Sequence, residues 1–115
     1  MLAGAVMAVL TLSGAQAATG RQTLDFEDVV RCAGLAQAAS ELEGGESAEG
    51  RALYDAALYW SLTAIQTAQS AGRAPAAAEA EQTRARIRAV RELSADDAGA
   101  RAELQRCRAR TPRLG

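Results

Sequence analysis

Three short breaks divide the chain into four helix-length segments, and this division limits its fold more than any other feature. The breaks are Gly44-Gly45, the stretch from Gly72 to Pro75, and Ser94-Ala95-Asp96-Asp97. Glycine ends helices, proline fits a first helical position, and Ser94 with Asp97 resembles a capping box. No strand pattern longer than a few residues is present. We therefore predict an all-α fold, a small four-helix bundle-like domain with helices at about 24–42, 48–71, 76–93 and 95–108.

The first segment has the caps and the periodicity of an amphipathic helix. Thr23 or Asp25 can cap its first turn, and Ser47 is placed to start the helix that follows. Its apolar residues recur three and four positions apart, as one buried face requires. They are Phe26, Val29, Val30, Ala33, Leu35, Ala36, Ala39 and Leu42.

The second segment is apolar on two sides. One row is formed by Leu53, Ala57, Trp60 and Ala64, and the other by Tyr54, Leu58, Leu62 and Ile65. Between Ala52 and Ile65 the only charged residue is Asp55, and Arg51, four residues earlier, can neutralise it. A helix with two apolar sides has to be covered on both. We therefore expect this helix at the centre of the fold.

The last two helices have thinner apolar faces. In the fourth helix Leu104 and Cys107 are expected to point inward, and Thr111-Pro112 ends it, leaving 111–115 as a flexible tail. In the third helix the expected inward residues are mostly small, which lets helices approach closely. They are Ala76, Ala80, Thr83, Ile87 and Val90.

The first 17 residues resemble a signal peptide. An apolar run at 2–12 is followed by Ala15-Gln16-Ala17, a small-x-small pattern that places cleavage between Ala17 and Ala18. The run is too short to cross a bilayer, which takes about 20 apolar residues. We therefore expect a processed protein that is periplasmic or secreted and not transmembrane. Residues 18–22 form a short leader before one helical domain at 23–110.

Cys32 and Cys107 are the only cysteines of the chain. An oxidising compartment would let them pair, which would clip the last helix onto the first. Redox-active cysteines usually occur as Cys-x-x-Cys at the start of a helix, and neither of these does. The sequence therefore predicts a structural disulfide.

The composition removes most catalytic chemistry. All 13 basic residues are arginine and histidine is absent, so no imidazole base, imidazole metal ligand or lysine Schiff base can form. With the cysteines paired, no thiolate remains for a metal, and we expect no cofactor. Only a carboxylate-dependent hydrolase remains as a remote alternative. Asp96 and Asp97 are adjacent and diverge on a helix, and the glutamates of the loop at 41–49 are spread around Gly44-Gly45.

Two surfaces are candidates for binding. Arg84, Arg88 and Arg91 share one side of the third helix and could contact anionic lipid or cell-wall polymer. The alternative is a solvated face on which Glu81 pairs with Arg84 and Glu92 pairs with Arg88. Tyr59 falls between the two apolar rows of the second helix and is either half-buried or an exposed aromatic anchor. Nucleic acid is not expected, because the net charge is −1 and no aromatic residues lie among the arginines.

These features favour a small exported helical protein that is not an enzyme and that acts by binding. The expected partner is another protein, and the role is that of an accessory, chaperone, inhibitor or immunity-type protein. The alternative is an envelope-associated protein that uses the arginine side of the third helix on anionic lipid or cell-wall polymer.

Overall fold

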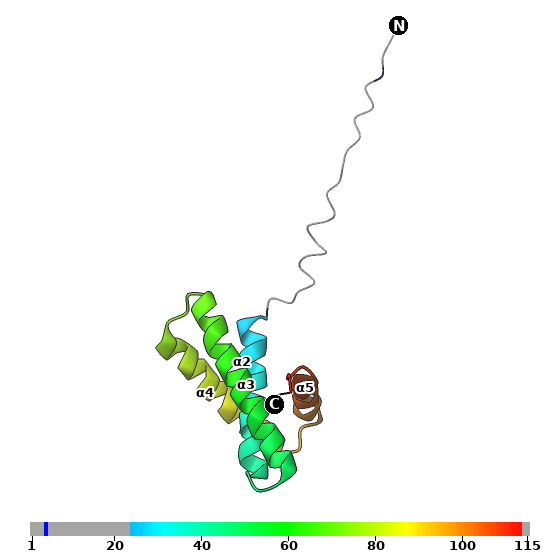
Figure 1. Cartoon of the computed structure of the whole chain (residues 1–115). Coiled ribbons are helices and arrows are strands. Elements are labelled where there is room, and N and C mark those ends of the chain that lie inside the picture. The colour runs from blue at the N-terminus through cyan, green and yellow to red at the C-terminus, as the bar shows by residue number, and fades with distance from the viewer. Residues whose placement is uncertain (1–3, 5–23, 114–115) are drawn as a thin grey trace.

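The computed structural model describes Gly4 and residues 24–113, and over this range the chain is all-helical. Its four helices are α2 (Phe26–Glu43), α3 (Ala48–Ser70), α4 (Pro75–Ser94) and α5 (Ala98–Ala109). Figure 1 shows α2, α3 and α4 as the long helices, with α5 to one side. The all-α prediction with four helices is confirmed. The predicted signal peptide and the leader at 18–22 lie outside the described residues, apart from Gly4.

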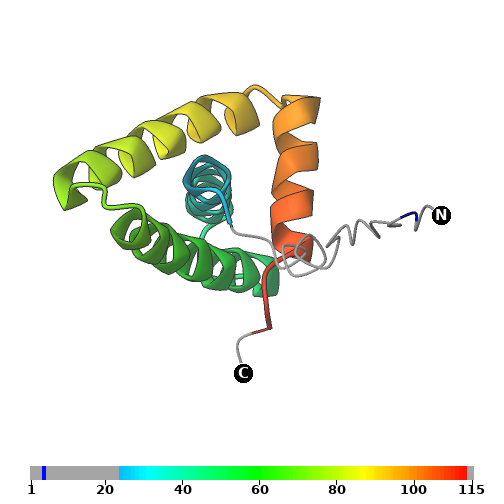
Figure 2. The ribbon, with the colours of Figure 1, turned by 90° about the horizontal axis from the view of Figure 1, so that it is seen from above.

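The central helix is α2, and the prediction that α3 would occupy this position was wrong. Viewed along α2, the other three helices form the sides of a triangle around it (Figure 2). Ten of the 18 residues of α2 are buried, including five consecutive ones from Cys32 to Ala36. Small side chains all round α2 let three neighbours pack against it, which a helix with larger residues would not allow.

Gly34 sets the distance between α2 and α4. A Cβ atom at this position would lie 2.6 Å from the backbone carbon of Ala85 and 2.9 Å from its Cβ. Glycine is therefore required here for the two backbones to touch. The buried residues of α4 are correspondingly small, namely Ala78 and Ala89.

The close approach through alanine also explains why the predicted inner face of α4 was wrong. Ala76, Ala80, Thr83 and Ile87 are exposed, and Val90 alone of the predicted residues is half-buried. Ile87 is 41% exposed. A side chain as large as isoleucine on the inner face, in place of Ala85, would push α4 away from Gly34.

The helix ends follow local chemistry at most positions. The side chain of Asp25 accepts a hydrogen bond from the Glu27 amide at the start of α2, and that of Ser47 accepts from the Gly50 amide at 2.9 Å. Gly44 ends α2 with a φ of 83°, a value that favours glycine. Pro75 occupies the first turn of α4.

The capping box predicted at Ser94 does not form. Ser94 is the last residue of α4, and Asp96 takes a left-handed conformation with a φ of 57° to reverse the chain. The cap of α5 is Asp97, whose carboxylate accepts a hydrogen bond from the Ala100 amide at 2.8 Å. An aspartate tolerates the left-handed region better than most residues, which allows this tight turn.

Candidate functional site

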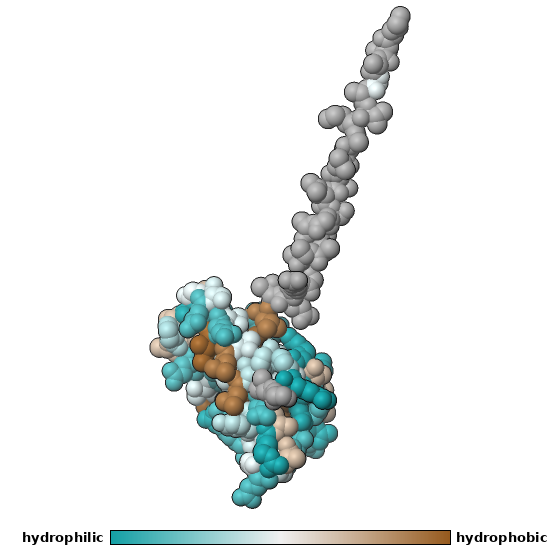
Figure 3. Space-filling view, viewed as in Figure 1, coloured by the Kyte–Doolittle hydropathy of each residue, from teal (hydrophilic) through white to brown (hydrophobic). Residues whose placement is uncertain are grey.

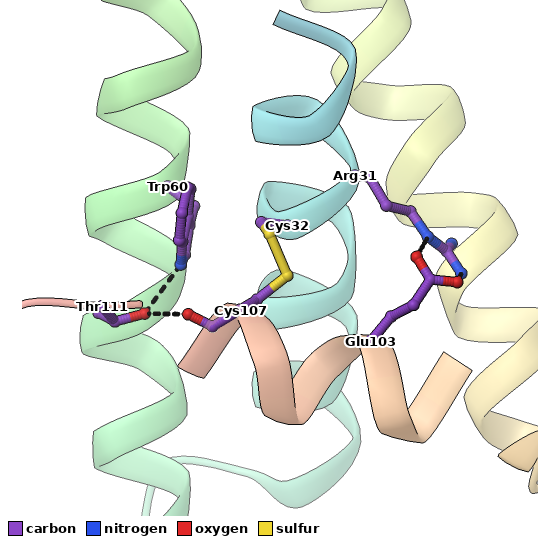
Figure 4. The surroundings of a disulfide bond; sticks show 6 residues. All are labelled: Arg31, Cys32, Trp60, Glu103, Cys107 and Thr111. Carbon is purple, nitrogen blue, oxygen red and sulfur yellow. Dashed lines mark hydrogen bonds and ion pairs between the residues drawn. A yellow bond between two sulfur atoms is a disulfide. The ribbon is translucent and has the colours of Figure 1, made fainter. Parts of the chain in front are cut away.

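The predicted disulfide between Cys32 and Cys107 is present, and it joins the middle of α2 to the end of α5 (Figure 4). Both cysteines are buried, at 3% and 5% exposure, so the bond is shielded from solvent. Next to it, the indole Nε1 of Trp60 donates a hydrogen bond to Thr111 Oγ1 at 2.8 Å, and that hydroxyl donates to the Cys107 carbonyl. Thr111 is therefore held in place, contrary to the prediction of a flexible tail beginning at this residue.

A second attachment of α5 is an ion cluster around Arg31. Its guanidinium contacts both oxygens of Glu92 on α4 and both oxygens of Glu103 on α5, with shortest distances of 2.7 and 2.9 Å. Figure 4 shows the α5 part of this cluster. Glu92 and Glu103 lie 61 and 72 residues after Arg31 in the sequence. No local pattern therefore indicated the cluster.

Two carboxylates that accept hydrogen bonds from arginines, those of Glu103 and Glu49, are stabilised in their charged form. The hydrogen bond from Arg31 lowers the pKa of Glu103, and the hydrogen bond from Arg108 lowers the pKa of Glu49. A general acid in glycoside hydrolysis needs the opposite shift. In the part of the chain that the structure describes, no group of three or more potential metal-ligating side chains occurs.

These pKa shifts predict a loss of stability in acid. In the folded chain the pKa values of both groups lie below the unfolded value of about 4.3. Their contribution to the free energy of unfolding is therefore complete above this pH. It is lost as the pH falls through the folded pKa values. We expect the melting temperature, followed by circular dichroism, to fall as the pH is lowered below about 4.3. A chain carrying Glu49→Gln and Glu103→Gln should melt lower at pH 7 and depend less on pH in this range. An equally steep dependence would show that other groups carry the acid response.

The main exposed apolar feature is one side of α3, which we call the α3 stripe and which consists of Tyr54, Leu58, Leu62 and Ile65. Their exposed fractions are 56%, 42%, 58% and 47%. In Figure 3 an apolar patch lies over the upper half of α3. The other row of α3 is buried, from Leu53 at 4% to Ala64 at 0%. The expectation that both sides of this helix are covered is therefore wrong for a single chain.

The two tyrosines of α3 differ in exposure. Tyr54, which belongs to an apolar row that was expected to be covered, is exposed. Of the two alternatives for Tyr59, the structure supports the half-buried one, and its ring packs edge to face against Trp60 with ring centroids 5.0 Å apart. The predicted pair between Arg51 and Asp55 does not form, because the Arg51 guanidinium donates to the Glu46 carbonyl instead.

A groove of about 470 Å³ adjoins the α3 stripe at Ile65 and runs between α3 and α4. Gln37 of α2, Gln69 of α3 and Gln82 of α4 line it, above the small side chains of Ala68 and Ala78. We call it the glutamine groove. Two arginines of its lining, Arg73 and Arg86, are ion-paired with Glu81 and Glu41. No local pattern in the sequence indicated this groove, because its glutamines come from three helices.

The third surface is the predicted arginine side of α4. Arg84, Arg88 and Arg91 surround the exposed Ile87, and Glu92 completes the depression that they line. We call these three arginines with Ile87 the arginine patch. Arg88 is paired with Glu92 at 3.2 Å, as expected for neighbouring charges four residues apart. The expected pair between Glu81 and Arg84 is replaced by Glu81 with Arg73.

Comparisons with known proteins add no assignment to this geometry. The chain matches no protein family, no curated protein and no solved structure. Within the described residues, no helix has the length and apolar character needed to cross a membrane. The case for a function therefore depends on the surfaces described above.

Proposed function

We propose that this protein acts by binding a further protein chain, and that the α3 stripe is its docking surface. The observation that carries the proposal is the row of four large apolar side chains, each between 42% and 58% exposed. Exposed apolar patches of roughly 300–600 Å² on a monomer are often functional. The partner's matching surface would be the apolar face of a helix, because the stripe follows one side of a straight helix for three turns.

The surroundings of the stripe favour a protein as its occupant. The amides of the glutamine groove, beside Ile65, can both donate and accept hydrogen bonds at the rim of such an interface. The segment from Ala56 to Gly72 carries no charge, so an apolar partner would not leave a buried ion unpaired. The disulfide supports an exported protein, and we place this function in the periplasm or outside the cell.

The arginine patch is the weaker candidate surface. Each arginine near an anionic surface contributes about 1 kcal/mol, so three supply about 3 kcal/mol. Stable membrane attachment takes a second signal, such as a lipid chain or a larger apolar insertion. Because Arg88 is already paired with Glu92, we give this surface no independent function.

A photo-crosslinking amino acid placed at Leu62 tests the proposal in the cells that produce the protein. We expect one cross-linked species of defined mass at this position, because docking would bring the partner into contact with it. The matched control is the same amino acid at Ile87, which is also exposed but lies on α4. The Leu58→Glu substitution should abolish the Leu62 product without changing the helical circular dichroism spectrum. Equal products at both positions, or none at Leu62, would refute the α3 stripe as a docking surface.

A further inference from the structure

We infer that the occupant of the α3 stripe is a second copy of this chain, whose α3 lies antiparallel to the first. This inference depends on the proposed docking function of the stripe and names its partner. It is carried by three observations on α3, which concern the spacing of the stripe, the distribution of charge along the helix, and the exposed area.

The spacing of the stripe makes it complementary to itself. Its residues lie four, four and three positions apart. A two-fold axis that crosses the stripe at the level of residue 60 along α3 therefore brings Leu58 opposite Leu62 of the second copy. The same axis brings Tyr54 opposite Ile65. The axis also falls near the middle of α3 (Ala48–Ser70), so the two helices overlap over almost their whole length. Each apolar side chain of the stripe thereby meets an apolar partner.

The charges of α3 favour the antiparallel orientation. Towards its beginning the helix carries Arg51, Asp55 and Glu49, the last of which is paired with Arg108, and it has no charge from Ala56 to its end. In the antiparallel pair, Arg51 comes opposite Gln69 of the second copy and Asp55 opposite Gln66. A parallel pair would bring Arg51 close to Arg51 of the second copy, and such a like-charge contact is destabilising.

The exposed area fits a weak, reversible dimer. The exposed fractions of the four stripe residues correspond to a patch of roughly 300–600 Å² per copy, which is less than the roughly 800 Å² per partner in a standard stable interface. The flanking side chains of Arg51, Asp55, Gln66 and Gln69 are exposed and supply further area at the rim. We therefore expect a dimer that forms in the micromolar range and dissociates on dilution.

Sedimentation velocity of the purified, oxidised chain at concentrations from nanomolar to submillimolar tests this inference. The intact mass of the same sample establishes the residue at which the purified chain begins. We expect a monomer–dimer equilibrium in the wild type and a dissociation constant at least about 30-fold weaker for Leu58→Glu. The control is Ile87→Glu, because Ile87 and Leu58 are equally exposed, at 41% and 42%. This control should dimerise like the wild type. Loss of dimerisation in both variants, or in neither, would overturn the α3 interface.

The orientation is tested by a spin label attached at Ala48→Cys, because Ala48 is exposed and its replacement leaves Arg51 and Asp55 in place. In the antiparallel dimer, the two labelled positions lie about 36 Å apart along the helix axes, from the 1.5 Å rise per residue, and about 10 Å apart across them. A parallel dimer would bring them within about 20 Å of each other. Pulsed electron resonance should therefore give a distance near about 37 Å, and a distance below about 20 Å would overturn the antiparallel arrangement.

These measurements separate this inference from the proposed function. A chain that is monomeric at every concentration, but that cross-links through Leu62 to a different protein, would refute the second copy as occupant while the docking surface stands. A chain that is monomeric and gives no cross-link at Leu62 would refute both.

Discussion

Reduction of the disulfide is expected to lower the free energy of unfolding by about 4 kcal/mol. The bond closes a loop between residues 75 apart in sequence, and freeing such a loop gives the unfolded chain this much conformational entropy in the loop-entropy model. Domains of this size have a total stability of about 5–15 kcal/mol. The loss is therefore a large part of the stability. It is greatest for α5, whose other attachments are ion pairs, the hydrogen bond at Thr111 and the apolar packing of Ala100 and Leu104.

Denaturant unfolding with and without reductant measures this loss. Trp60 is the only tryptophan and reports on the end of α5, because it donates to Thr111 and lies under the Arg110 guanidinium. A variant with Cys32→Ala and Cys107→Ala should unfold at the same low denaturant concentration in both conditions. A reduced wild type that is less than 1 kcal/mol weaker than the oxidised one would contradict a stabilising role for the bond.

The substitution Gly34→Ala is expected to destabilise the fold by about 2 kcal/mol, although alanine is the better helix former. Alanine in place of glycine gains about 1 kcal/mol within a helix. At Gly34 the added Cβ would meet the backbone of Ala85 at 2.6 Å, and the resulting separation of α2 from α4 costs about 1–3 kcal/mol beyond that gain.

The matched control for this prediction is Gly99→Ala in α5. A Cβ there meets only the Asp97 carboxylate, at 3.3 Å, and that side chain can shift. Thermal unfolding of the two variants should therefore show a lower melting temperature for the first and little change for the second. A stabilised Gly34→Ala chain would contradict the close approach of α2 and α4.

The features that the sequence predicted correctly are those that are encoded locally. Ser47, Gly44 and Pro75 act on the backbone within a few residues, so their effect on the helix ends could be recognised. The inner face of α2 repeats at helical spacing, and only Leu42 among its predicted residues is exposed, at 53%. The disulfide followed from having just two cysteines in a chain for which export was predicted.

The features that could not be predicted depend on how helices meet. Small residues were correctly expected on the inner face of α4, but the predicted face, with Ala80 and Ile87, is exposed, and the contact with Gly34 is made by Ala85 instead. The Arg31 cluster joins residues that only the fold brings together. The second apolar row of α3 was visible, but a pattern within one helix does not say whether its own chain or another covers it.

Hydroxyl-radical footprinting gives the most direct test of whether the α3 stripe is covered when the protein works. The protein is labelled once in the producing cells, at its natural expression level, and once after purification and dilution. We expect Tyr54 and Leu62 to be labelled several-fold less in the cells, and Ile87 to be labelled equally in both. Equal labelling of Tyr54 and Leu62 in the two states would show that nothing docks on this face of α3.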